Sequence, residues 1–250
     1  MSSVATSAVV LACTFGGALL GMVLRRALPE AHLDAASKDV LRLATGVIAT
    51  MTALSLGALL ASAKGSYDTE SRELTEMSAK VVMVDRFLAQ YGPEAKEARG
   101  LLRRSAAAAI DRIWPADRSQ PPELGPMGGY SALYGIIQDL VPSSEAQRSL
   151  QARALDKVVE IGETHVLLVQ RQATLLFRPL LVALVFWLTL TFVSFSPHAP
   201  PNPTVVAALF VCALSVSSAI LLIMDMNAPF QGLAQISSEQ LRRVLATLGE

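Results

Sequence analysis

The chain has 250 residues, of which 52% are hydrophobic and 17% are charged, and its mean hydropathy is +0.44. This balance is too apolar for an ordinary soluble domain and too charged for a chain that lies wholly in lipid. Residues 64–178 hold 15 basic and 15 acidic residues, whereas the rest of the chain has only 12 charges. The pattern indicates membrane segments on either side of a polar insert, and the balanced charge argues against a nucleic-acid partner.

Four stretches are apolar enough, and long enough or nearly so, to cross a bilayer, and none of them contains a charged residue. They cover residues 5–24, 43–63, 180–196 and 204–224. The first is predicted to be a retained helix, because its apolar region is too long for a signal peptide and Arg25 and Arg26 follow it. The last two are joined by the proline-rich link PHAPPNP, so we expect them to form a helical hairpin.

The glycines and cysteines of these spans indicate helix packing and do not indicate a catalytic or metal-binding site. Gly17 and Gly21 form a GxxxG pattern, which is typical of close helix packing. Cys13 and Cys212 lie in apolar runs, so we expect buried, inert thiols and neither a disulfide nor a metal site. The three histidines are scattered along the chain, and no metal or cofactor is predicted.

One face of the second predicted span carries four hydroxyl groups with two apolar residues between them. These six positions, here called the hydroxyl stripe, are Thr45, Ile48, Thr52, Ser55, Leu59 and Ser62. Another face carries glycine and alanine and could pack tightly. The hydroxyls could bond back to their own helix or to a neighbouring helix. Alternatively, they could line a pore that holds ions weakly and closes by dewetting at its apolar positions.

The second span leaves the membrane through the segment ASAKGSYDTESREL, which carries Lys64, Tyr67, Asp68 and Arg72. Tyr67 would suit the level of the lipid headgroups, and Asp68 and Arg72 are four residues apart on a helix. We therefore interpret these four residues as a membrane-exit motif that starts the next helix.

The insert is predicted to be helical throughout. Two helices show an apolar stripe with a spacing of three and four residues, at positions 74, 77, 81, 84, 88 and 91 and at positions 158, 161, 165, 168, 172 and 175. Gly92 and Pro93 end the first of these helices, and another helix follows to about Trp114. A short helix is expected at 130–140, and Ser143 or Ser144 could cap the last one.

Two polar side chains, His165 and Gln172, interrupt the stripe of the last insert helix. They could form hydrogen bonds within a helix–helix contact, or they could line an aqueous passage. The helix points toward the third span, with Pro179 as a boundary or kink.

The predicted fold is therefore an all-α membrane protein with four transmembrane helices and a helical insert between the second and the third. Its parts are the first pair of spans (5–63), the insert (64–178), the second hairpin (179–225) and a short tail (226–250). The sequence contains no phosphate-binding loop, nucleophile elbow or paired-histidine zinc motif, so no enzyme is predicted. No span holds an ionisable residue, which argues against a proton-coupled transporter.

Two short segments resemble the bestrophin family. Lys64, the run Ser66-Tyr67-Asp68 and the pair Arg72-Glu73 resemble the segment after the second bestrophin span. The turn DMNAPFQGL, with Pro229, Phe230 and Gly232, resembles the one after the last bestrophin span. The runs RLATGVIAT, YGPEA and IWP make the chain more closely similar to uncharacterised bacterial bestrophin-like membrane proteins.

This resemblance implies a homo-oligomeric, pentameric channel for inorganic ions, mostly anions, in the lipid bilayer of the bacterial inner membrane. It implies that the second span, with its hydroxyl stripe, lines the pore, and that both termini and the insert are cytoplasmic. The positive charges near the span ends do not by themselves fix the orientation. No acidic cluster follows Phe230, which argues against a calcium switch of the bestrophin kind.

The alternative is a non-conducting membrane scaffold or sensor. In this interpretation the spans only anchor the chain, and the amphipathic helices of the insert bind a protein partner. The two apolar stripes of the insert are compatible with either function.

Overall fold

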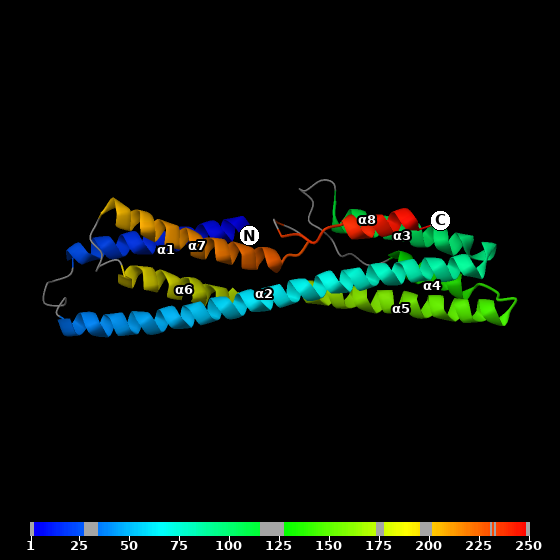
Figure 1. The fold of residues 1–250 in the computed structure, drawn as a ribbon, viewed down its shortest axis with the longest axis horizontal. Helices are drawn as coiled ribbons and strands as arrows, with labels where there is room; N and C mark the ends of the chain where they lie inside the picture. Colours follow the sequence, from blue (N-terminus) through cyan, green and yellow to red (C-terminus); the bar gives the residue numbers. More distant parts are fainter. Residues whose placement is uncertain are drawn as a thin grey trace. The chain divides into compact units, whose positions relative to one another are not determined.

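A computed structural model describes residues 3–27, 35–115, 128–173, 178–195, 202–230, 232 and 234–248. Every regular element in these ranges is helical, as predicted (Figure 1). The elements are α1 (Ser3–Ala27), α2 (Ala35–Tyr91), the short 3₁₀ helix η2 (Pro93–Ala95), α3 (Lys96–Ile113), α4 (Gly128–Gln138), α5 (Glu145–Ala173), α6 (Arg178–Phe195), α7 (Pro203–Met226) and α8 (Glu239–Thr247).

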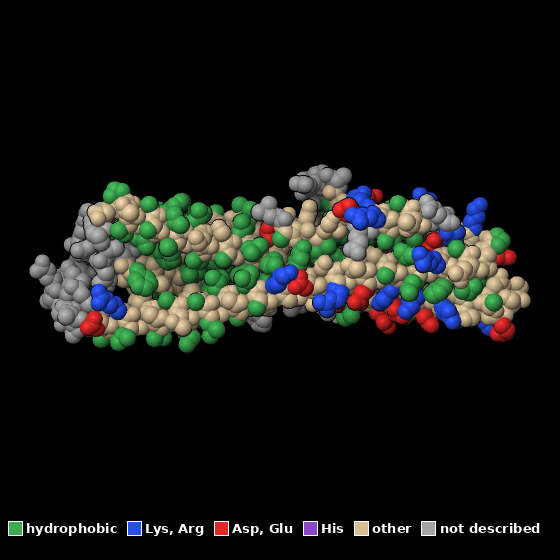
Figure 2. Space-filling view, viewed as in Figure 1, with side chains coloured by type: hydrophobic (Ala, Val, Ile, Leu, Met, Phe, Trp, Pro, Cys, Tyr) green, Lys and Arg blue, Asp and Glu red, His purple; other side chains and the backbone are tan. Residues whose placement is uncertain are grey.

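The chain divides into two compact units. Unit 1 comprises Met1–Ser66 and Leu176–Ala228, and unit 2 comprises Tyr67–Leu175 and Pro229–Glu250. Hydrophobic side chains gather over α1, α6 and α7, whereas charged side chains gather over α3, α5 and the later part of α2 (Figure 2). The difference in surface follows the difference in composition between the spans and the insert.

Unit 1 is built around α1, which packs against both α6 and α7. Val10, Leu184, Leu188 and Ile220 form one of its buried clusters. Three helices in the described ranges are long and apolar enough to cross a membrane, at Ser3–Leu24, Arg42–Tyr91 and Pro203–Met226. The apolar part of α6, Pro179–Phe195, is shorter. The chain is therefore a helical membrane protein.

Close packing of α1 on α6 depends on Gly17. A Cβ atom at Gly17 would lie 3.0 Å from Cγ2 and 3.3 Å from the carbonyl oxygen of Thr189. Gly16, by contrast, has open space around it. The close contact predicted from the GxxxG pattern is thus confirmed at Gly17.

Two buried serines join α1 to α7. The Ser217 hydroxyl donates to the Ser7 carbonyl at 2.7 Å, and the Ser7 hydroxyl donates to the Ser217 carbonyl at 3.0 Å. The two hydroxyl oxygens are 2.7 Å apart. Because lipid offers no alternative partners to these groups, the pair helps to fix the register of α1 against α7.

The prediction of buried cysteines was wrong, because Cys13 and Cys212 are both exposed on unit 1. An apolar run indicates only that a helix avoids water. It does not distinguish the face that packs on other helices from the face that meets lipid. The two thiols are free and lie on the outward face of their helices.

Unit 2 has a core that follows the predicted stripes. Leu74, Met77, Val84, Leu88 and Tyr91 of α2 are all buried. On α5, Val158, Ile161 and Leu168 are buried and His165 is half-buried, whereas the side chain of Gln172 and Leu175 lie outside the described residues.

The helix boundaries of the insert agree closely with the sequence. Gly92 ends α2 with a φ of 128°, a conformation that side-chain-bearing residues rarely adopt, and Pro93 begins η2. Ser144 caps α5, because its hydroxyl accepts the backbone N–H of Gln147 at 3.1 Å. The Gln147 side chain also donates to the carbonyl of Tyr91 at 2.8 Å, which ties the start of α5 to the end of α2.

The main difference from the prediction is the length of α2. The sequence predicted a span that ends near residue 63 and a membrane-exit motif that starts the next helix, but one helix runs through the span and the whole motif. The change in composition at residue 64 is a change of surroundings. The membrane-exit segment contains no proline, and its single glycine, Gly65, costs a helix only about 1 kcal/mol.

Candidate functional site

The structure places the hydroxyl stripe on one face of α2, as helical periodicity requires. Within a single chain, Thr45 and Thr52 are buried, with 5% and 4% of their surface exposed. Ile48, Ser55 and Leu59 are half-buried, and Ser62 is exposed. The Thr52 hydroxyl donates to the Ile48 carbonyl at 2.7 Å, and Leu59 packs against the buried cluster around Leu184. Thr45, Thr52 and Leu59 therefore face the interior of unit 1. A role for all six residues of the hydroxyl stripe in lining a pore stays a prediction.

The face of α2 that carries small residues is open in the single chain. Gly46, Thr50, Ala53, Gly57 and Ala61 are all exposed. A Cβ atom at Gly46 or Gly57 would meet nothing within 4 Å. The sequence suggested that this face could pack and that the hydroxyl face could meet water; in the single chain this face is exposed, and Thr45 and Thr52 of the hydroxyl face are buried. In the membrane, this face is covered either by lipid or by other copies of the chain.

The membrane-exit motif lies on α2 where unit 1 gives way to unit 2 along the sequence. Lys64 and Arg72 are exposed, and Asp68 is half-buried. Tyr67 is half-buried and packs against the core of unit 2. Its ring therefore contacts the core of unit 2, and its place at the level of the lipid headgroups stays a prediction.

Sequence reasoning missed a buried carboxylate in the next turn of α2. Glu70 is only 9% exposed, and its Oε2 atom is buried. The apolar stripe at 74, 77 and 81 extends backwards with the same spacing through 70 and 67. Continuing that stripe by two positions would have found both Glu70 and the packing of Tyr67.

A second charged group that the sequence did not single out joins α2 to α3. Arg99 donates two hydrogen bonds to the carboxylate of Asp85, from Nε at 2.8 Å and from a terminal nitrogen at 3.0 Å. The side chain of Asp85 is only 10% exposed. The hydrogen bond to the Asp85 carboxylate is the largest cause of a raised pKa at Arg99. This planar, two-bond geometry fixes the angle at which the chain turns around Gly92.

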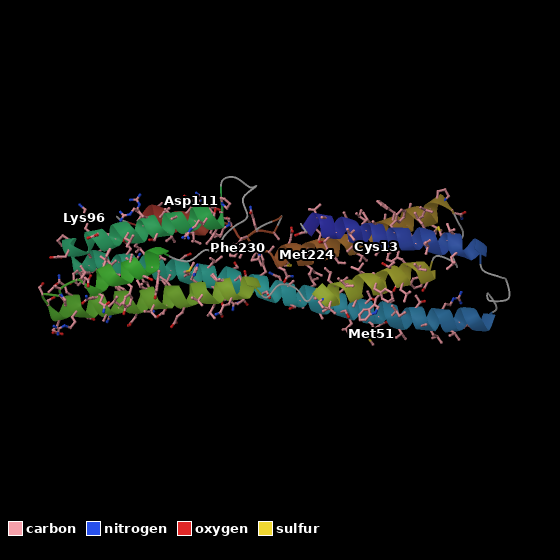
Figure 3. All side chains as sticks on the ribbon, turned by 180° about the vertical axis from the view of Figure 1, so that it is seen from behind. Cys13, Met51, Lys96, Asp111, Met224 and Phe230 are labelled. Carbon is pink, nitrogen blue, oxygen red and sulfur yellow. The ribbon has the colours of Figure 1, made fainter. Side chains whose placement is uncertain are left out.

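The turn after α7 folds into the core of unit 2. Pro229 and Phe230 are buried, and Gly232 has a φ of 82°. The Phe230 ring, labelled in Figure 3, meets the ring of Trp114 edge-on, with centroids 5.8 Å apart and an interplanar angle of 81°. The backbone N–H of Ile236 donates to the Pro229 carbonyl at 2.7 Å.

A further hydrogen bond closes this arrangement, because Nε1 of Trp114 donates to the Ile236 carbonyl at 2.8 Å. Trp114 of the run IWP and Phe230 of the turn after α7, which are more than 100 residues apart in the sequence, thus form one contact. No sequence pattern paired them. Only their separate likeness to family segments marked them as important.

The helices and the long apolar segments define an all-helical membrane protein. The family model of the Bestrophin-like domain matches residues 12–241, which is nearly the whole chain. The chain therefore belongs to the bestrophin-like family, and the predicted resemblance is confirmed.

Among solved structures, the chain is similar to a mutant of a bacterial bestrophin homolog from Klebsiella pneumoniae. The TM-score is 0.66 at 13% sequence identity, and the alignment covers 97% of both chains. At this identity the likeness shows a shared fold. None of the curated proteins matches the chain.

Proposed function

We propose that this protein is an oligomeric membrane channel through which inorganic ions, chiefly anions, move passively. The observation that carries the proposal is the family match over residues 12–241, together with a fold that follows the bacterial homolog from end to end. The chain is proposed to cross the bacterial inner membrane four times, with α6 as the shortest span. Residues 64–178 form the insert, and the insert and both termini lie in the cytoplasm.

The subunits are proposed to form a closed ring, a pentamer by family resemblance, with α2 nearest the axis. Because Thr45 and Thr52 are buried within the single chain, the proposed pore wall leaves these two residues out. Ile48, Ser55 and Ser62 follow one another at intervals of seven residues and lie at the edge of the buried face, where they are half-buried or exposed. A ring of such positions supplies hydroxyls and an apolar constriction to the pore.

A cysteine experiment in liposomes tests this pore wall. Cys13 and Cys212 are exposed and must first be replaced by alanine. Ser55→Cys is then introduced, with Thr52→Cys as the matched control on the buried side of the same helix. An anionic, water-soluble thiol reagent should modify Ser55→Cys quickly and reduce chloride efflux, whereas Thr52→Cys should react more slowly.

Two results would count against the proposal. Equal reaction at both positions, without any change in efflux, would remove this edge of α2 from the pore. Absence of ion flux from a protein that is correctly assembled in liposomes would favour the non-conducting scaffold or sensor, in which the insert binds a protein partner.

A further inference from the structure

Unit 2 contains a cavity that the proposed channel function does not use. Its volume is about 230 Å³, and its walls come from five helices, α2, α3, α4, α5 and α8. The apolar lining includes Val81, Leu102, Leu133, Val158, Ile161 and Leu241. An apolar cavity of about 150 Å³ is known to hold a benzene-sized molecule, so this one has room for a hydrocarbon chain.

The charged residues in the described lining are both arginines, Arg104 and Arg112 of α3. They are separated by about two helical turns, or about 12 Å along the axis. Nε of Arg112 donates to the Ala108 carbonyl at 3.2 Å. Arg104 is exposed and makes no hydrogen bond or ion pair with another residue in the described ranges. The cavity is therefore apolar inside and cationic along α3.

Two neutral hydroxyl side chains, Ser105 of α3 and Tyr130 of α4, also belong to the lining. Ser105 follows Arg104, and its hydroxyl oxygen would lie only 2.1 Å from a Cβ atom at Gly129. Tyr130 follows Gly129, and a Cβ atom at Gly162 would lie 2.8 Å from its hydroxyl oxygen. The Ser105 hydroxyl thus lies against α4 and the Tyr130 hydroxyl against α5. Burial, and after it the nearby carboxylate of Glu163, raises the pKa of Tyr130.

We propose that this cavity binds a single-chain amphiphile with a carboxylate head, the class of a medium-chain fatty acid. The tail occupies the apolar interior, and Arg104 at the edge of the cavity pairs with the carboxylate. A mostly apolar pocket with a charged residue that fixes the orientation of the ligand is a usual form of a small-molecule site. Guanidinium is the side-chain group that best matches a carboxylate. The site lies within unit 2 and does not depend on whether the protein conducts ions.

Decanoate binding to the full chain in lipid nanodiscs tests the proposal. Nanodiscs replace detergent, because a detergent is itself an amphiphile and would compete. Labelled decanoate is dialysed to equilibrium against nanodiscs with and without protein, and the difference gives the bound ligand. The proposal expects saturable binding of one molecule per chain, with decanol, which has the same tail and no carboxylate, binding about tenfold more weakly.

Variants of α3 separate the tail site from the head site. Ala109→Phe fills the cavity, and Ala107→Phe is its matched control on a residue that does not line the cavity. Arg104→Gln should weaken decanoate binding about tenfold and leave decanol unchanged, whereas Arg112→Gln should have a smaller effect.

The opposite results overturn the proposal. Protein-containing nanodiscs that bind no more decanoate than empty ones would leave the cavity without this ligand class. Equal affinity for decanoate and decanol would exclude a carboxylate-specific head site. Binding that is lost in Ala107→Phe but kept in Ala109→Phe would place the ligand outside the cavity.

Discussion

Replacing Phe230 with alanine tests whether the turn after α7 is part of the core of unit 2. The side chain is 5% exposed and meets Trp114 edge-on. Truncation of a buried phenylalanine to alanine typically costs about 3–5 kcal/mol. About 0.5–1.5 kcal/mol of that loss belongs to the aromatic pair itself. Phe230→Leu keeps most of the volume and should cost under about 1.5 kcal/mol.

The chain offers a direct optical probe for this experiment. It contains two tryptophans, Trp114 and Trp187, so a Trp187→Phe background leaves the one that touches Phe230. Urea unfolding of the full chain in one detergent, followed by Trp114 emission, gives the free energy of unfolding around this contact. Phe186→Ala is the control, because that ring is 61% exposed and its loss should not move the Trp114 transition.

A loss below about 1 kcal/mol in Phe230→Ala, with Trp114 emission unchanged, would refute the reasoning, since surface substitutions usually fall within about 0.5 kcal/mol. That result would mean that the Phe230 contact contributes little to the stability of unit 2. Phe230→Leu separates the two contributions to this loss of free energy. It keeps most of the buried volume but removes the aromatic contact with Trp114.

Three further predictions follow from the packing. Gly17→Ala should destabilise the chain by about 1–3 kcal/mol through overpacking, whereas Gly16→Ala should be neutral or stabilising, as thermal unfolding in detergent would show. Asp85→Ala should cost about 3–5 kcal/mol in urea unfolding, because it strands Arg99, and joint replacement of both by leucine and methionine should recover most of the loss. The hydrogen bond from Lys157 is the main cause of a lowered pKa at Glu160. The stability that Glu160 contributes is therefore present above its unfolded pKa of about 4.3 and is lost as pH falls through its folded pKa. Glu160→Gln should flatten the melting temperature against pH in that acidic range.

Elements with a strong period could be predicted from the sequence, and relations between distant residues could not. The stripe from Leu74 to Tyr91, the stop at Gly92 and the cap at Ser144 each depend on local chemistry, and the structure has all three. The pairing of Trp114 with Phe230 depends on how the chain returns after α7, which no local pattern encodes.

The continuity of α2 shows a different limit. The sequence changes from apolar to charged at Lys64, and this change was interpreted as the start of a new helix. Polarity reports the surroundings of a backbone, whereas glycine, proline and capping residues report its conformation. Residues 59–74 include no proline and a single glycine, Gly65, so α2 passes from apolar to polar surroundings without a break.

The hydroxyl stripe shows why the pore wall needs more than one chain to assign. In a soluble protein the exposed face of a helix is polar, but on α2 the exposed face carries Leu43, Val47, Met51 and Leu54, each more than half exposed. Such a face is stable only against lipid or another copy of the chain. Thr45 and Thr52 are buried in the single chain, and the Thr52 hydroxyl donates to its own helix, so burial in one chain does not select them as pore residues.

Lipid tails are as apolar as leucine, so an apolar face gains little by leaving them. Association in a bilayer depends on close backbone approach, which the open space at Gly46 and Gly57 allows. If these glycines meet a neighbouring subunit, leucine at Gly57 should break the oligomer while leaving unit 1 folded. The mass of the purified protein, with the detergent micelle subtracted, measures this directly. A ring that survives Gly57→Leu unchanged would turn this face toward lipid or the pore and leave the subunit contact to other helices.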